Sequence, residues 1–220
     1  MIVRHEPRFI EQIATKDNLL KAWGHVRNGR KRGSPDLRAM KEIEDRKNGS
    51  GEFVTSIRDQ LLDGTYTPEP VRRQQIEKAP GEYRNLGIPT IRDRVAQYAV
   101  AHVIEPSLEK TFSNDSFGFR PHRTAHDALA VLEQEIQAGN GYIVEVDLTL
   151  YFDTIPHNRL LELLYTELRD ESIVELISRW LSAGVMVEGE LEPSLCGAPQ
   201  ADHCLRCYRT CISTNWINIG

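Results

Sequence analysis

The sequence predicts an α+β fold, and three observations support that prediction. Apolar residues recur every four positions in a helical run that includes Ile91, Val95 and Ala99. Two extended runs flank the turn at 79–82, which indicates a β-hairpin. A short apolar run at 142–148 has the length and composition of a buried strand.

The elements before the hairpin are expected to be helical. Residues 1–30 have helical character without clear caps, and the Gly- and Pro-containing stretch 29–35 is predicted to be a loop. A second helix is predicted over 53–62, and Gly64 supplies its C-terminal stop. The stretch 65–71 contains two prolines, so its backbone must be extended up to the hairpin.

A long helix is predicted directly after the hairpin, which spans 71–89. Thr90 can cap its N-terminus, and Asp93 is favourably placed in the first turn. Pro106 is expected to interrupt this helix, with a further turn running to Thr111.

The loop 113–123 leads to another helix, which Thr124 and Asp127 open with capping-box spacing. This helix is expected to end at Gly139. It is also expected to bury one apolar face, formed by Ala128, Leu129, Leu132 and Ile136.

The strand 142–148 follows that helix. Two further helices are predicted near 157–168 and 171–183, each with apolar residues on one face. Residues 185–191 are predicted to form a second hairpin that turns at 188–189.

Composition places the chain among ordinary globular proteins. Its 220 residues suffice for one or two domains, with 40% hydrophobic and 27% charged residues. The sequence has no apolar run of membrane-spanning length and no apolar signal segment at its N-terminus, so a cytoplasmic location is expected.

Charge is distributed unevenly although the net charge is only −5. Residues 1–50 carry 12 Lys and Arg against 7 Asp and Glu, whereas residues 124–220 carry 5 against 15. The basic run Arg30, Lys31 and Arg32 could lie along a phosphate backbone or form a solvated turn.

The end of the 142–148 strand is the most informative position. Asp147 is a strand-end carboxylate, followed by Tyr151, Phe152 and a second carboxylate, Asp153. A strand end holds a metal ligand more firmly than a loop does. The alternative is a polar residue that simply marks the end of a buried strand.

Four ordered blocks resemble the reverse transcriptases of bacterial group II introns. They lie at 83–95, 116–128, 146–155 and 197–200, within a resemblance that covers roughly residues 50–200. The resemblance implies the fingers and an incomplete palm of a right-hand polymerase.

The resemblance also implies roles around a Mg²⁺ site. Asp147 matches the first catalytic, metal-binding aspartate, and the backbone carbonyl of Leu148 would be a further metal ligand. Asp153 is expected to be structural.

Four residues match positions that bind the incoming dNTP. Lys78 and Arg84 would clamp the triphosphate by charge-assisted hydrogen bonds, or would only form an exposed hairpin pair. Phe152 would exclude a 2′-hydroxyl, and Gln200 would lie near the nascent base pair.

The loop 113–123 is a candidate nucleic-acid contact. Arg120 and Arg123 could bind template backbone or bases beside the aromatic residues of the loop. Equally, Phe117 and Phe119 could only pack the loop onto the core.

The sequence departs from the family pattern after Gln200. Ala201 and Asp202 stand where the family has Gly-Gly, and no Asp-Asp motif follows. Loss of one base after the Gln200 codon would shift the reading frame. The gene for the sequence that the family has at this point would then encode a tail like the one observed. Residues 201–220 are therefore predicted to be a frameshifted tail without a selected fold. The alternative reads three cysteines as a zinc cluster: Cys204, Cys207 and Cys211.

The expected organisation is a basic helical extension at 1–50, fingers at 51–140 and a partial palm at 141–200, followed by the tail. By resemblance, the function is RNA-directed DNA polymerisation with Mg²⁺, and the implied partners are dNTPs, a DNA primer and template or intron RNA. The chain alone is expected to be inactive because catalytic carboxylates are missing. Alternatives are a non-catalytic intron-RNA-binding fragment and a decayed gene product. The incomplete palm also predicts self-association.

Overall fold

The computed structural model describes residues 8–29, 36–147, 154–194 and 196–197. The described helices are α1 (Phe9–Ile13), α2 (Lys16–Asn28), α3 (Leu37–Glu44), α4 (Gly49–Asp63), α5 (Ile91–Leu108), the short 3-10 helix η1 (Glu109–Thr111), α6 (Ala125–Gln137), α8 (His157–Leu168) and α9 (Glu171–Ser182). The described strands are β1 (Val71–Ala79), β2 (Glu82–Ile88), β3 (Val185–Val187) and β4 (Glu190–Glu192).

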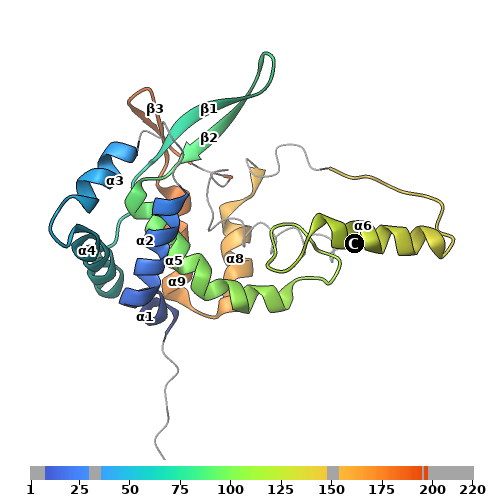
Figure 1. Cartoon of the computed structure of the whole chain (residues 1–220), viewed down its shortest axis with the longest axis horizontal. Helices are drawn as coiled ribbons and strands as arrows, with labels where there is room; N and C mark the ends of the chain where they lie inside the picture. Colours follow the sequence, from blue (N-terminus) through green and yellow to red (C-terminus); the bar gives the residue numbers. More distant parts are fainter. Residues whose placement is uncertain (1–7, 30–35, 148–153, 195, 198–220) are drawn as a thin grey trace, which may run out of the picture.

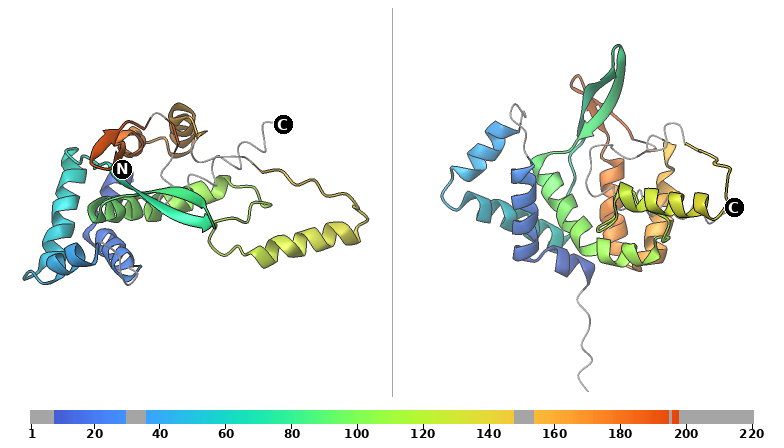
Figure 2. Two further views of the ribbon diagram at one scale, coloured as in Figure 1. Left: turned by 90° about the horizontal axis from the view of Figure 1, so that it is seen from above. Right: turned by 45° about the vertical axis from the view of Figure 1, so that its right-hand side comes forward.

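The predicted α+β class is confirmed. Two antiparallel hairpins form one sheet of order β2-β1-β3-β4, because β1 and β3 pair in parallel through Val71 and Val185. The β1–β2 hairpin projects from the helical body in Figure 1, and the right-hand view of Figure 2 shows the same. Both predicted hairpins therefore form, and a parallel pairing that the sequence did not reveal joins them.

Helix α5 lies at the centre of the core and contacts α1, α2 and α8. Its buried residues occupy more than one face, as expected for a helix packed on several sides. They include Val95, Ala96, Ala99, Val100, Ile104 and Leu108. The remaining core comes mainly from α2, α4, α8 and α9.

The predicted interruption at Pro106 is wrong, because α5 continues through it to Leu108. An interior proline removes one backbone hydrogen bond and crowds the carbonyl four residues earlier, so other contacts must stabilise the turn that contains it. Ile104 and Leu108 are both fully buried on either side, and their packing holds the last turn in place.

The N-terminal helices differ from the prediction in two ways. The Thr15 side chain accepts a hydrogen bond from the Asn18 backbone N–H, so α2 does have a cap. Helix α3 was not predicted, because only Met40 of its eight residues is buried. An ion pair of 2.6 Å between Arg94 and Asp36 links the start of α3 to α5.

The predicted burial of α6 is wrong. The helix forms with the predicted capping box between Thr124 and Asp127, but none of its residues is buried. Leu129 is 61% exposed, and Leu132 and Ile136 are also exposed. Figures 1 and 2 show α6 and the segment after it projecting away from the helical body. Its apolar face therefore lacks the surface against which it was expected to pack.

The predicted strand 142–148 is also wrong in its described part, because residues 142–147 form no strand. Tyr142 is 98% exposed and Val144 85% exposed. A strand needs a neighbour that supplies hydrogen bonds, and among the described strands none pairs with this segment.

No helix in the described ranges is long and apolar enough to cross a membrane.

Candidate nucleotide and nucleic-acid site

The β1–β2 hairpin carries the two residues predicted to bind triphosphate. Arg84 in β2 lies opposite Ile76 in β1, and Lys78 lies at the irregularity in register between Glu77 and Ala79. The backbone thus brings both positions into the outer half of one projecting hairpin. The side chains of Lys78 and Arg84 lie outside the described part of the structure.

The base of this hairpin is fixed to the β3–β4 hairpin. The Val71 N–H donates to the Gly184 carbonyl at 3.1 Å. Arg73 forms an ion pair of 2.9 Å with Glu192. Gly184 has a φ of +82°, and a Cβ there would lie 2.8 Å from the Glu192 carbonyl oxygen. Position 184 therefore requires glycine for β3 and β4 to meet the hairpin base.

A buried carboxylate fixes the chain that enters the hairpin. Asp93 accepts hydrogen bonds from the Tyr66 hydroxyl at 2.6 Å and the Thr90 hydroxyl at 2.7 Å. It also accepts a bond of 3.2 Å from the backbone N–H of Glu69. Burial first, and then the Asp93 charge, raise the pKa of Tyr66 above its ordinary value. The tyrosine therefore stays a neutral donor.

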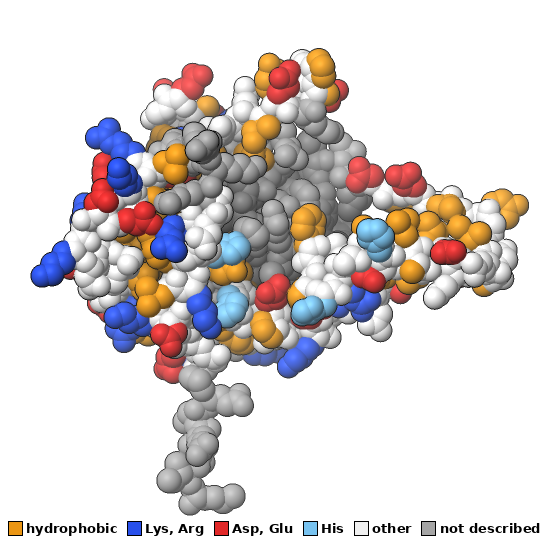
Figure 3. Space-filling model, in the orientation of Figure 1, with side chains coloured by type: hydrophobic (Ala, Val, Ile, Leu, Met, Phe, Trp, Pro, Cys, Tyr) orange, Lys and Arg blue, Asp and Glu red, His pale blue; other side chains and the backbone are white. Residues whose placement is uncertain are grey.

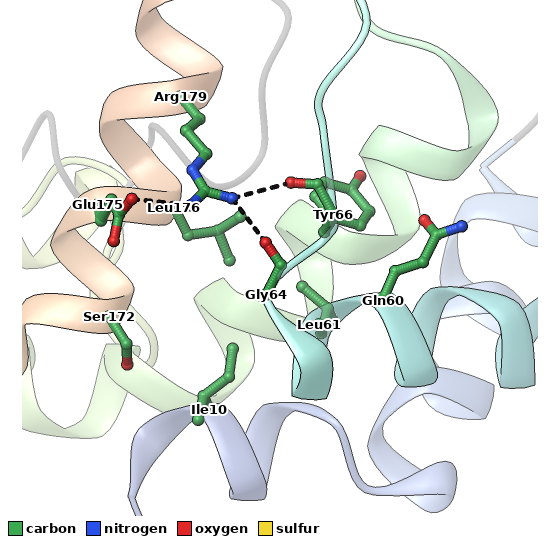
Figure 4. Close-up of a pocket in the computed structure, with 9 residues that line it drawn as sticks. All are labelled: Ile10, Gln60, Leu61, Gly64, Tyr66, Ser172, Glu175, Leu176 and Arg179. Carbon is green, nitrogen blue, oxygen red and sulfur yellow. Dashed lines mark hydrogen bonds and ion pairs between the residues drawn. The ribbon is translucent and has the colours of Figure 1, made fainter.

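A small cavity lies between α1, α4 and α9, beside the chain that enters the hairpin. Arg179 of α9 donates to the carbonyls of Gly64 and Tyr66 at 3.0 and 3.2 Å, and to Glu175 at 2.7 Å (Figure 4). The cavity has a volume of about 90 Å³, far below the several hundred Å³ typical of ligand sites. It is therefore a structural junction between α9 and the hairpin entry, and not a nucleotide site. Its lining residues are Ile10, Gln60, Leu61, Gly64, Tyr66, Ser172, Glu175, Leu176 and Arg179.

The loop 113–123 is organised around Arg120. This guanidinium is buried and donates to Glu109 and the Ser116 carbonyl at 2.7 Å each, and also to the Ser113 carbonyl. These bonds direct its donors into the loop, away from solvent. Direct nucleic-acid contact by Arg120 stays a prediction, but the geometry gives the residue a role in shaping the loop.

Arg123 occupies a different environment in the same loop. It is half-buried, and its guanidinium lies over the Phe117 ring at 5.4 Å. Phe119 is exposed, and both Phe119 and His122 have left-handed backbone conformations, with φ of 58° and 59°. Of the two predicted arginines, Arg123 is the one that a nucleic acid could reach at the surface.

Asp147 is exposed at the end of the projecting segment 142–147. Among the residues that the structure describes, no three His, Cys, Asp or Glu side chains are grouped to hold a metal ion. A two-metal site needs several carboxylates, so the described residues do not by themselves assemble one. Leu148 and Phe152 lie outside the described residues, as do Arg30, Lys31, Arg32 and Gln200.

One association between the blocks was not predicted. The Gly197 N–H donates to the Ile155 carbonyl at 2.9 Å, and a ring nitrogen of His157 lies 2.7 Å from the Gly197 carbonyl oxygen. Pro156 and Cys196 form an isolated antiparallel bridge. The start of the 197–200 block therefore lies beside the end of the 146–155 block. His157 carried no sequence signal for this contact beyond its place at the start of a helix.

Basic side chains are restricted to one part of the visible surface. In Figure 3, Lys and Arg lie among Asp and Glu over the helical body, whereas the outer part of the projecting segment that contains α6 shows apolar and acidic side chains. A polyanion would therefore be repelled by the outer part of this segment.

Comparison with known proteins finds a matching family and several similar proteins. A family model described as reverse transcriptase (RNA-dependent DNA polymerase) matches residues 76–200. Protein YkfC of Escherichia coli is 35% identical over 148 residues, which cover 66% of this chain and 39% of that protein. The group II intron-encoded protein LtrA of Lactococcus lactis is 37% identical over 160 residues, which cover 72% of this chain and 26% of that protein.

A solved structure shares the fold. The chain of a partial Cas6-RT-Cas1–Cas2 complex matches 97% of this chain with a TM-score of 0.64 and 18% identity, and the match covers 35% of that chain. The present chain thus spans well under half the length of these relatives.

Proposed function

Because the chain belongs to the reverse transcriptase family of RNA-dependent DNA polymerases, we propose that it supplies the fingers and part of the palm of such an enzyme. In this proposal the β1–β2 hairpin binds the incoming dNTP, with Lys78 and Arg84 on its triphosphate. Phe152 contacts the sugar, and Gln200 lies at the nascent base pair. The observation that carries the proposal is the family match over 76–200, which includes β2, the turn and the end of β1.

The described residues do not complete the proposed metal site. Asp147 and the carbonyl of Leu148 would bind Mg²⁺, which neutralises charge on a triphosphate and a primer oxygen in phosphoryl transfer. Asp147 has no described carboxylate cluster around it. We therefore expect the 220-residue chain to lack polymerase activity by itself.

Primer extension tests this expectation. The purified chain would be incubated with an RNA template, a DNA primer, dNTPs and Mg²⁺, with an active full-length reverse transcriptase as the positive control. We expect no incorporation above background at concentrations where the control enzyme extends the primer. Incorporation by the chain that disappears in an Asp147→Asn variant would overturn the expectation.

A second candidate function is non-catalytic RNA binding by the same fold. The excess of basic residues in 1–50 and the surface position of Arg123 favour it. In this proposal the Arg120 guanidinium acts by holding the loop, while Arg123 and the run Arg30, Lys31 and Arg32 contact phosphate.

The loop contact can be tested with matched arginine variants. Arg123→Ala should weaken binding to single-stranded RNA and lower the salt slope, log Kobs against log salt, by about 0.7. Arg159→Ala is the control, because Arg159 is exposed on α8, where it forms an ion pair of 3.0 Å with Glu162 of the same helix. Equal effects of both variants would show that net charge, and not the loop, is responsible.

The organisation into an extension (1–50), fingers (51–140), partial palm (141–200) and frameshifted tail (201–220) is part of the proposal, as is the cytoplasmic location. The tail and its cysteines at 204, 207 and 211 lie outside the described residues. Sequencing the gene past the Gln200 codon tests the frameshift. A gene with no palm-encoding frame downstream would overturn it.

A further inference from the structure

Glu109 lies where the central helix α5 passes into the loop 113–123. It is the C-terminal cap of α5, and its backbone N–H donates to the Glu105 carbonyl. The preceding residue, Leu108, is fully buried, and the Thr111 hydroxyl donates to the Leu108 carbonyl at 2.8 Å. The backbone of Glu109 is therefore held by the core of the fold, and its carboxylate can act as a fixed anchor for the loop.

The loop is fastened to Glu109 through Arg120. Nε and Nη2 of Arg120 both donate to the same carboxylate oxygen of Glu109, at 3.0 and 2.7 Å. On its other side, the guanidinium donates through Nη1 to the Ser116 carbonyl at 2.7 Å and to the Ser113 carbonyl. The Arg120 side chain is only 5% exposed. One planar group thus joins the end of α5 to two points of the loop, which a lysine ammonium could not do with the same geometry.

Arg120 lies between two residues with unusual backbone conformations. Phe119 and His122 have φ of 58° and 59°, in the left-handed region that non-glycine residues seldom adopt without support from surrounding contacts. The Arg123 N–H closes the turn by donating to the Arg120 carbonyl at 3.4 Å. The backbone that carries Arg123 is therefore held by the turn that begins at Arg120, and the Arg123 guanidinium lies over the Phe117 ring at 5.4 Å.

We propose that Glu109 is a positioning residue for RNA binding by Arg123. It acts through Arg120, which it anchors to α5, and it does not touch the RNA itself. This role rests on the proposed contact between Arg123 and phosphate. A carboxylate repels a polyanion, so removal of Glu109 would strengthen RNA binding if only net charge mattered. The positioning role predicts weaker binding instead.

A double variant that leaves the net charge unchanged gives the first test. Glu109→Ala with Arg120→Ala removes one charge of each sign and leaves neither partner buried without the other, so the helical body should stay folded. For single-stranded RNA, we expect the salt slope, log Kobs against log salt, to fall by about 0.7, as expected for Arg123→Ala. Partial unfolding would lower the affinity by the same factor at every salt concentration and would leave this slope unchanged.

The control is a second charge-neutral double variant, Arg159→Ala with Glu162→Ala. These two side chains form an exposed ion pair of 3.0 Å on α8. The pair lies outside the loop, so its removal should leave the slope at the wild-type value. Amide hydrogen exchange locates the effect, because residues 113–123 should exchange faster only in the variant that lacks Glu109 and Arg120.

Single variants show whether the effect passes through Arg123. Glu109→Ala keeps Arg120 and makes the net charge more positive, yet we expect it to weaken RNA binding and to lower the slope about as much as Arg123→Ala does. Arg120→Lys keeps the charge but cannot reach the same acceptors, so it should have the same effect. In an Arg123→Ala background, neither change should lower the affinity or the slope further, because the contact that they position is already absent.

Four results would overturn the proposal. A wild-type slope in the double variant, with or without faster exchange in 113–123, would mean that Arg123 does not need the anchor. Stronger RNA binding by Glu109→Ala would mean that only net charge matters at this position. A further loss in the Arg123→Ala background would mean that Arg120 contacts RNA directly. A wild-type slope in Arg123→Ala alone would instead remove the proposed phosphate contact, and the role of Glu109 with it.

Discussion

At the residue scale, Asp93 links the long central helix to the chain that enters the hairpin. It is 1% exposed and accepts bonds from Tyr66, Thr90 and Glu69, all of which are donors. In Asp93→Asn an amide nitrogen would face one of these donors. We expect the free energy of unfolding to fall by about 2–3 kcal/mol in urea titrations. Asp59→Asn, at an exposed surface ion pair, should change it by less than about 0.5 kcal/mol. A similar small loss in both variants would contradict the role assigned to Asp93.

The raised pKa of Tyr66 predicts how the free energy of unfolding changes at alkaline pH. Burial and the Asp93 charge raise its pKa above the ordinary value of 10.0, so the folded chain holds this proton more tightly than the unfolded chain does. The stabilisation is therefore complete below about pH 10 and is lost progressively as the pH rises above it. Urea titrations between about pH 8 and 11 should show this decline. The decline should be smaller in Tyr66→Phe and unchanged in Tyr142→Phe, because Tyr142 is 98% exposed. Identical profiles for wild type and Tyr66→Phe would rule the effect out.

At the element scale, α6 depends on its cap because packing contributes little to it. The Thr124 side chain accepts from the Asp127 N–H, and the Asp127 carboxylate accepts from the Thr124 N–H and hydroxyl. Thr124→Ala should destabilise the helix by about 1 kcal/mol and speed amide exchange in α6 about fivefold. Thr55→Ala is the control, because Thr55 bonds within α4 and caps nothing. Unchanged exchange in α6 would show that tertiary contacts hold this helix.

Acid should weaken the same cap. Hydrogen bonds from Thr124 hold the pKa of Asp127 below its ordinary value of 3.8. The folded carboxyl therefore binds its proton less tightly than the unfolded one, so the stabilisation is present above about pH 3.8 and is lost as pH falls through the lowered pKa. Amide exchange in α6, corrected for its intrinsic pH dependence, should accelerate over that range. In Asp127→Asn this acceleration should be absent.

Elements with local signals could be predicted, and those that depend on distant partners could not. The Thr90 cap, the stop at Gly64 and the turn at 79–82 are encoded within a few residues and were predicted correctly. Burial of Leu129 and strand pairing of 142–147 were predicted, but each requires a neighbouring helix or strand from elsewhere in the fold. The apolar pattern indicates that such a neighbour is needed and cannot show whether it is present. The same holds for the site. The pattern places Lys78 and Arg84 on the hairpin, but it cannot tell that Arg120 bonds to Glu109 and the loop carbonyls.

At the scale of the whole molecule, charge is distributed unevenly along the chain. Residues 1–50 carry 12 Lys and Arg against 7 Asp and Glu, whereas residues 124–220 carry 5 against 15. A polyanion is therefore attracted more to the N-terminal part than to the C-terminal part. The proposed RNA contact through the N-terminal part and the proposed dNTP contact through the hairpin are both compatible with the family.

The charge separation predicts how salt controls RNA binding. Changing Arg30, Lys31 and Arg32 together to alanine removes three cations from the basic part. If each contacts one phosphate, the salt slope, log Kobs against log salt for single-stranded RNA, should fall by about 2. Fluorescence anisotropy across a salt series measures this slope for the full chain.

The matched control removes three cations elsewhere, through Lys110→Ala, Arg159→Ala and Arg169→Ala. Both triple variants have the same net charge, so a nonspecific attraction would weaken equally in each. Contact through the basic run predicts a reduced slope only in the first variant, because released counterions report phosphates that are actually neutralised. An unchanged slope in the first variant would assign the run to the solvated turn that its sequence also allows.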